Sequence, residues 1–104
     1  MSDAYELYQR GKTDLKRGNA EEATVALEQA KQLEPDKASI REALGIAYFR
    51  IRRWKKAEAE FRKVLELSPA DDYAHWALGR TLERQGRPDE ASTHLKLARS
   101  LRPR

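Results

Sequence analysis

The stretch ALGIAYFRIRRWKKAEAEFRKVLELSP, residues 43–69, holds the features that decide the fold. Its apolar residues recur at steps of three and four on both sides of a polar turn, a spacing that is typical of amphipathic helices. Pro69 ends the second of these segments, because proline has no backbone N–H and pushes the preceding residue out of helical geometry. The stretch therefore predicts two helices joined by a turn.

The same pattern occurs three times, and corresponding residues lie 34 positions apart. Four columns are identical in all copies: Gly11, Gly45 and Gly79; Ala23, Ala57 and Ala91; Leu33, Leu67 and Leu101; Pro35, Pro69 and Pro103. The glycine and alanine columns are expected where the two helices of a hairpin approach closely. Copies at residues 4–37, 38–71 and 72–104 predict one domain, residues 1–104, with six helices of about 13 residues.

The residues between the repeated segments predict where helices begin. Asp36 and Asp71 are expected to cap the first helices of the second and third copies. Asn19 with Glu22 three residues later has the spacing of a capping box, and Pro88 suits the first position of the last helix.

These columns resemble the tetratricopeptide repeat, a helix-turn-helix unit of the same length. The matching residues of the second copy are Leu44, Gly45, Tyr48, Trp54, Ala57, Phe61, Val64, Leu67 and Pro69. The resemblance implies an all-α fold, a right-handed superhelical solenoid of three antiparallel helix-turn-helix hairpins. It also implies a non-catalytic protein–protein interaction module or scaffold. The first copy departs from the pattern at Arg10 and Asp14, as expected for a helix with no preceding repeat to cover it.

On the first helix of each copy, one stripe of residues points away from the direction of Leu78, which is taken as buried. The stripes are Tyr5, Tyr8, Lys12, Leu15 and Lys16; Ser39, Glu42, Ile46, Phe49 and Arg50; Tyr73, Trp76, Arg80, Glu83 and Arg84. They hold five of the eight aromatic residues of the chain. In proteins that this sequence resembles, the first helices line an inner ligand groove.

The predicted partner-binding groove is aromatic and basic. Its residues are Tyr5, Tyr8, Lys12, Lys16, Ile46, Phe49, Arg50, Tyr73, Trp76, Arg80 and Arg84. Such a groove favours a protein or peptide that is acidic or ends in a free carboxylate and that carries apolar anchors. The alternative is that the tyrosines pack between neighbouring first helices while the arginines face only water.

One kind of partner is not predicted. Related domains that grip the C-terminal carboxylates of heat-shock chaperones use an ordered set of Lys, Asn, Asn, Lys and Arg. The matching positions here hold Tyr8, Lys12, Ala43, Tyr73 and Ala77, so the set is absent.

Three other interpretations concern the turn of the second copy, an alternative ligand and the last helix. The stretch RIRRWKK, residues 50–56, is the turn between the two helices of the second copy, and its charges are expected to face water. On the helix that follows, the i, i+4 spacing of Lys56 with Glu60 and of Glu58 with Arg62 predicts two ion pairs on a solvated face. A single-stranded nucleic acid is a weaker alternative ligand, because the net charge is only +4. Leu97 and Leu101 lie on the last helix, for which no covering helix is predicted, and they suggest self-association into a homo-oligomer. The alternatives are that Lys96 and Arg99 suffice as a polar cap, or that the chain is part of a longer repeat array.

Composition excludes several other classes of function. The chain has no cysteine, so thiolate metal sites and cysteine nucleophiles are excluded. His75 and His94 show no metal-ligand spacing, and no phosphate loop or nucleophile motif occurs, so we expect no metal, no cofactor and no enzyme activity. Neither a signal peptide nor an apolar run long enough for a membrane span is present, which predicts a cytoplasmic protein without membrane contact.

Overall fold

The computed structural model describes residues 3–103, and within that range it contains helices and turns but no strand. The helices are α1 (Ala4–Lys16), α2 (Ala20–Leu33), α3 (Ala38–Arg50), α4 (Trp54–Leu67), α5 (Asp72–Arg84) and α6 (Pro88–Leu101). Each has 13 or 14 residues, which confirms the lengths expected from the sequence. Proline stands at the first position of α6, as predicted.

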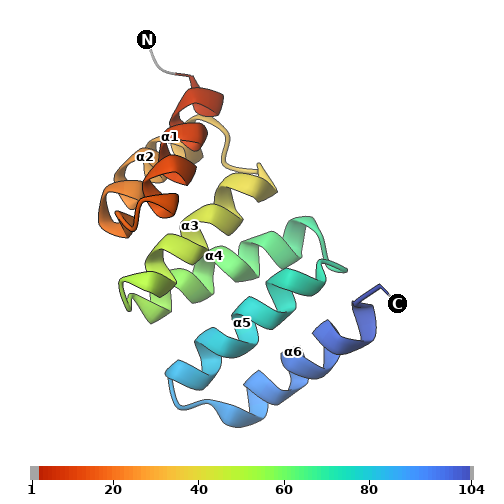
Figure 1. Ribbon diagram of the computed structural model, residues 1–104. Coiled ribbons are helices and arrows are strands. Elements are labelled where there is room, and N and C mark those ends of the chain that lie inside the picture. Colours follow the sequence, from red (N-terminus) through yellow and green to blue (C-terminus); the bar gives the residue numbers. More distant parts are fainter. Residues whose placement is uncertain (1–2, 104) are drawn as a thin grey trace.

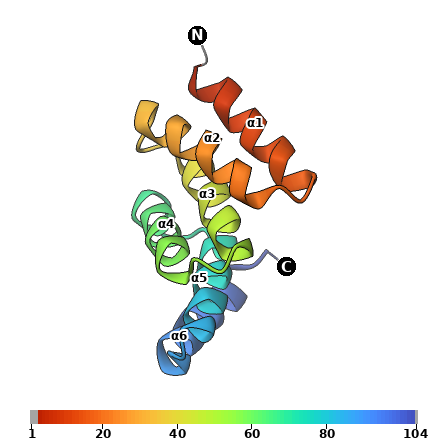
Figure 2. The same cartoon turned by 90° about the vertical axis from the view of Figure 1, so that its left-hand side faces the viewer.

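The six helices form three antiparallel hairpins that stack one on the next (Figure 1). Each helix packs mainly against its neighbours in the sequence, and α1 also touches α3. The stack is elongated, 44 × 24 × 23 Å, and the side view shows the hairpins following one another from α1 and α2 to α6 (Figure 2). This arrangement is the right-handed solenoid that the sequence predicts.

The helix ends confirm some of the predicted caps and contradict others. Asp71 caps α5 by accepting a hydrogen bond of 3.0 Å from the Ala74 N–H. The prediction for Asp36 is wrong, because α3 begins one residue later with Lys37 at the cap position, and Asp36 instead pairs with Lys63 at 3.5 Å. Asn19 does occupy the cap position of α2, but its side chain makes no capping hydrogen bond, so the capping box does not form.

The repeated glycines lie where the helices of a hairpin approach each other most closely. A Cβ atom on Gly45 would stand 2.7 Å from Cε1 of Phe61, and one on Gly79 would stand 2.7 Å from Cδ2 of Leu95. Both separations are far shorter than a van der Waals contact between carbon atoms. A side chain in this column would therefore force the facing Phe61 or Leu95 side chain, or the helix that carries it, to move.

The core runs through the stack and contains one charged group that the sequence did not reveal. Large apolar side chains from successive hairpins fill it, among them Leu27, Leu44, Phe61, Leu78 and Leu82.

Glu60 of α4 lies beside this core, only 5% exposed, and it accepts hydrogen bonds of 3.0 Å from Lys31 of α2 and from Arg41 of α3. The spacing of charges had suggested that Glu60 faces water next to Lys56. That interpretation is wrong, because this side of α4 faces the preceding hairpin.

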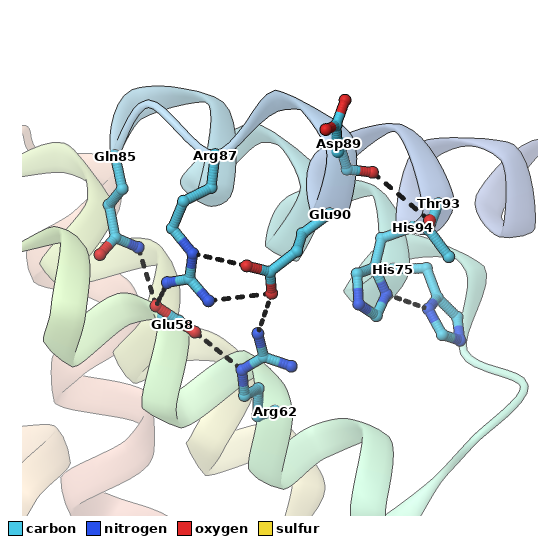
Figure 3. A network of polar contacts seen from close by, with 9 residues as sticks. All are labelled: Glu58, Arg62, His75, Gln85, Arg87, Asp89, Glu90, Thr93 and His94. Carbon is cyan, nitrogen blue, oxygen red and sulfur yellow. Dashed lines mark hydrogen bonds and ion pairs between the residues drawn. The ribbon is translucent and has the colours of Figure 1, made fainter.

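A second polar network joins α4 to the turn before α6 (Figure 3). Glu58 accepts hydrogen bonds from Arg62, Gln85 and Arg87, and Arg87 also forms a two-bond pair with Glu90. Burial alone would raise the pKa of the Glu58 carboxyl, but these hydrogen bonds hold it below its usual range. The Glu58–Arg62 pair is the only one of the two ion pairs expected on α4 that the described residues form.

Candidate functional site: an aromatic and basic groove

The first helices of the three hairpins line the same side of the stack, and two hollows lie between them. The hollow between α3 and α5 has a volume of about 320 Å³. Its walls are Ile46, Phe49, Arg50, Phe61, Tyr73, Trp76, Ala77, Arg80 and Arg84. We call it the α3/α5 hollow.

A second hollow of about 240 Å³ lies between α1 and α3. It is lined by Tyr8, Lys12, Leu15, Lys16, Ser39, Glu42, Ala43, Ile46 and Arg50. Ile46 and Arg50 belong to both hollows, so the two form one groove along the first helices. We call this combined surface the groove.

Aromatic rings form much of the wall of the α3/α5 hollow. The ring centroids of Tyr73 and Trp76 are 5.7 Å apart, and Trp76 remains 42% exposed. On the opposite side, Phe49 makes an edge contact with Trp54, the first residue of α4, at 5.0 Å between centroids. A tryptophan left this open to water at the mouth of a hollow is a common anchor of protein interfaces.

The cations of the groove differ in how much of their binding capacity is already used. Arg50 donates a hydrogen bond of 2.8 Å to the Leu15 carbonyl at the end of α1, so it bridges two first helices. Arg80 is paired with Glu83 at 2.9 Å, although both side chains stay exposed. The guanidinium of Arg84 lies 5.8 Å from the centroid of the Trp54 ring. Lys12 lies 5.3 Å from the Tyr8 ring.

One acidic group also lies in the groove. Burial raises the pKa of the Glu42 carboxyl above its usual range, and the nearby charge of Asp71 raises it further. Burial likewise raises the pKa of Tyr73, and Glu42 adds to that effect. The α1/α3 end is therefore of mixed charge, whereas three arginines surround the α3/α5 hollow.

Ten of the eleven residues predicted for the groove line these two hollows. The exception is Tyr5, which is 68% exposed and borders a third hollow at the start of α1 with Glu34 and Lys37. This third hollow adjoins the α1/α3 hollow, because Tyr8 and Ser39 line both. Leu15 was assigned to the outward stripe, but it is 9% exposed and belongs to the core, with one side reaching the α1/α3 hollow. Leu97 and Leu101 of α6 are 41% and 37% exposed, outside the groove.

Sequence reasoning missed two features. The floor of the α3/α5 hollow includes Phe61 of α4, which the stripe of a single helix does not reveal. Sequence reasoning also missed that His75 and His94 meet, with their Nδ1 atoms 3.1 Å apart (Figure 3). The repeat period carried a signal for this contact, because 34 residues earlier the same columns hold Arg41 and Glu60, which form an ion pair.

Residues 3–103 hold neither a cluster of metal-binding side chains nor a helix suited to span a membrane. No three histidine, aspartate or glutamate side chains there lie close enough together to hold a metal ion. None of the helices in this range combines the length and apolarity needed to cross a membrane.

Comparisons with known proteins agree with the fold. The model of the tetratricopeptide repeat family matches residues 38–104, which is more than half of the chain and leaves out the divergent first copy. No curated protein sequence matches this chain significantly.

Several solved structures superpose closely. The second TPR of Spaghetti (RPAP3), bound to an HSP90 peptide, has a TM-score of 0.92 at 20% identity, over 97% of this chain and 94% of that chain. A MamA mutant has a TM-score of 0.92 at 26% identity, over 97% and 74%. YrrB, described as a TPR protein with an unusual peptide-binding site, has a TM-score of 0.94 at 21% identity, over 99% and 53%.

Proposed function

This chain belongs to the tetratricopeptide repeat family, and we propose that it is a non-catalytic module that binds a segment of a partner protein in the groove. The repeats 4–37, 38–71 and 72–104 act as one domain in this function. The observation that carries the proposal is the α3/α5 hollow, where exposed aromatic rings and three arginines surround a cavity of about 320 Å³.

The chemistry of the α3/α5 hollow selects the kind of segment. Trp76 and Phe49 favour a large apolar side chain as the anchor, since burying it removes apolar surface from water on both partners. Arg80 and Arg84 at the rim favour a carboxylate beside that anchor, either of an acidic residue or of a chain end. The preferred ligand is therefore a peptide segment with an apolar anchor next to negative charge.

Two relatives support this mode of action without identifying the partner. The RPAP3 domain is bound to an HSP90 peptide, and YrrB has a peptide-binding site. The residues that grip chaperone tails in related domains are absent here, and two of the matching positions are the buried Ala43 and Ala77. We therefore propose a different peptide partner.

The test is selection from a library of random peptides displayed on phage. We expect the wild type to enrich peptides with a large apolar residue near an acidic one. A Trp76→Ala, Arg80→Gln variant should lose this enrichment while keeping its helical circular dichroism. The matched control is Val25→Ala, Arg99→Gln, which shortens an exposed apolar side chain and removes an arginine, both outside the hollows. The proposal fails if the wild type enriches nothing, or if both variants enrich the same peptides.

Self-association through α6 is a second candidate function, and Leu97 is the observation that favours it. Leu101 carries less weight, because the corresponding Leu33 of the first repeat is 56% exposed even though α3 packs against α2. Light scattering from micromolar to millimolar concentration should show a mass that rises with concentration and falls in Leu97→Gln. A monomer throughout would refute self-association.

A further inference from the structure

The turn between α3 and α4, which we call the basic turn, is the sequence RIRRWKK, residues 50–56. Its five cationic side chains are all exposed, and none of them forms an ion pair with any residue in the range 3–103. The corresponding turns differ in charge. The first turns of α2 and α6 carry two acidic residues each, whereas the first turn of α4 carries none.

Burial alone would raise the pKa of the Glu28 carboxyl, but hydrogen bonds hold it below its usual range, and Lys56 of the basic turn helps to lower it without forming an ion pair with it. Glu58 is the first acidic residue of α4, and its carboxylate is already engaged by Arg62, Gln85 and Arg87 (Figure 3). In the third repeat, Arg87 has both Glu58 and Glu90 as partners. Arg50 donates to the Leu15 carbonyl and Lys56 lies over the Tyr48 ring, so the charges of Arg52, Arg53 and Lys55 are the ones left for an external anion.

The basic turn adjoins the groove. Arg53, Trp54, Lys55, Lys56 and Gln85 line a hollow of about 440 Å³, which we call the turn hollow. The edge contact between Phe49 and Trp54 forms a common wall, because Phe49 faces the α3/α5 hollow and Trp54 faces the turn hollow. Arg84 lines the α3/α5 hollow and lies over the Trp54 ring. A chain leaving the groove past Arg84 thus meets the basic turn next.

We propose that the basic turn binds an acidic stretch of the same partner segment whose apolar anchor occupies the α3/α5 hollow. The inference rests on the proposed function of the groove and adds a second contact beside it, with Arg50 common to both. Consecutive residues of an extended peptide are about 3.3 Å apart, so a few residues suffice to pass from one hollow to the next. The partner is therefore bipartite, with an apolar anchor joined to a cluster of carboxylates.

The charges favour an acidic protein segment over a nucleic acid. A single strand following the same path would carry a phosphate at every nucleotide. Along the groove it would pass close to Glu42 and Glu83, whereas a peptide can present apolar residues there and confine its negative charge to one end. Exposed cations chiefly accelerate association and set its salt dependence, so the contact should weaken as salt is added.

The experiment uses the same peptide library with an additional pair of variants. Arg53→Gln, Lys55→Gln removes two of the five positive charges of the basic turn without touching either hollow of the groove. Lys96→Gln, Arg99→Gln removes the same net charge from exposed cations of α6 that form no ion pair with residues 3–103. Enriched peptides are then synthesised with their acidic residues intact or replaced by the corresponding amides, and affinity is measured by fluorescence anisotropy at low and at high salt.

We expect the wild type to enrich peptides that carry a cluster of acidic residues on one side of the anchor. The Arg53→Gln, Lys55→Gln variant should keep the anchor preference but lose the acidic cluster, and should bind the intact peptide about three- to tenfold more weakly at low salt. The Lys96→Gln, Arg99→Gln variant should behave as the wild type.

If the wild type enriches peptides that carry the apolar anchor but no acidic cluster, the inference is overturned and the proposed function of the groove is retained. A cluster preference that survives in Arg53→Gln, Lys55→Gln would also overturn it. A fluorescent single-stranded oligonucleotide that binds through Arg53 and Lys55 while acidic peptides do not would replace it with nucleic-acid binding. A failure of the groove itself is distinguishable, because then no anchored peptide is enriched at all.

Discussion

Replacing Glu60 with alanine should destabilise the protein more than any other single change of an acidic residue in α4. Glu60 is 5% exposed and receives two hydrogen bonds of 3.0 Å from cations. Removing one partner of a buried ion pair costs about 3–5 kcal/mol when the remaining charge is left without compensation. Here the compensation is partial. Lys31 keeps Glu28 at 2.9 Å, and Arg41 keeps the Pro35 carbonyl at 2.8 Å.

The free energy of unfolding should therefore fall by about 2–3 kcal/mol in Glu60→Ala, near the value of one to two hydrogen bonds to charged groups. For a domain of this size that change lowers the melting temperature by roughly 10 °C or more. Urea denaturation followed by circular dichroism and by tryptophan fluorescence measures it, and coincident transitions show that the stack unfolds as one unit.

The matched control is Glu66→Ala on the same helix. Glu66 is exposed, and its distance of 3.8 Å from Lys63 is that of a weak surface pair, so the expected cost is below about 0.5 kcal/mol. A double variant Arg41→Leu, Glu60→Ala reproduces the residues of the first repeat, Leu7 and Ala26, and should recover part of the loss. Equal costs for Glu60→Ala and Glu66→Ala would refute the reasoning, because the burial of Glu60 would then have no energetic consequence.

Three further changes test the hairpin contacts and the polar contacts. Gly45→Ala should cost about 1–2 kcal/mol in urea denaturation, because overlap with the buried Phe61 outweighs the better helix propensity of alanine, and a stabilised variant would contradict the close approach. Burial and the neighbouring His75 lower the pKa of His94, so its contribution to stability is present above the unfolded pKa of about 6.5 and is lost as pH falls through the lower folded pKa. Between about pH 7.5 and about pH 5, the free energy of unfolding should therefore fall less in His94→Gln than in the wild type. Equal falls in urea denaturation would show that the titration of His94 does not contribute to the pH dependence of stability. Tyr48→Phe removes the hydroxyl that donates to Glu28 and should cost about 1–2 kcal/mol, while an unchanged urea midpoint would show that the bond contributes nothing.

The direction in which the groove faces was predictable from the sequence, because it depends on the local geometry of one helix. Residues at a given angle on a regular helix share a face, so the stripe containing Trp76 and Arg80 could be placed opposite Leu78 without knowledge of the neighbouring hairpins. Tyr5 was placed in the groove by the same rule and lies outside both of its hollows. The angle was correct, but Tyr5 lies beside Glu34 and Lys37 of the turn between α2 and α3.

The period of 34 residues and the spacing of apolar residues by three and four positions determined the six helices, their pairing into hairpins and the glycines where they cross. These properties are local, so one repeat is enough to define them. Only the tertiary structure decided that Glu60 is buried between two cations, that His75 meets His94, and that the basic turn shares a wall with the groove. Each of these contacts joins helices of different repeats or the two helices of one hairpin. Their formation depends on the rotation and spacing with which the helices stack, which the pattern along a single helix does not contain.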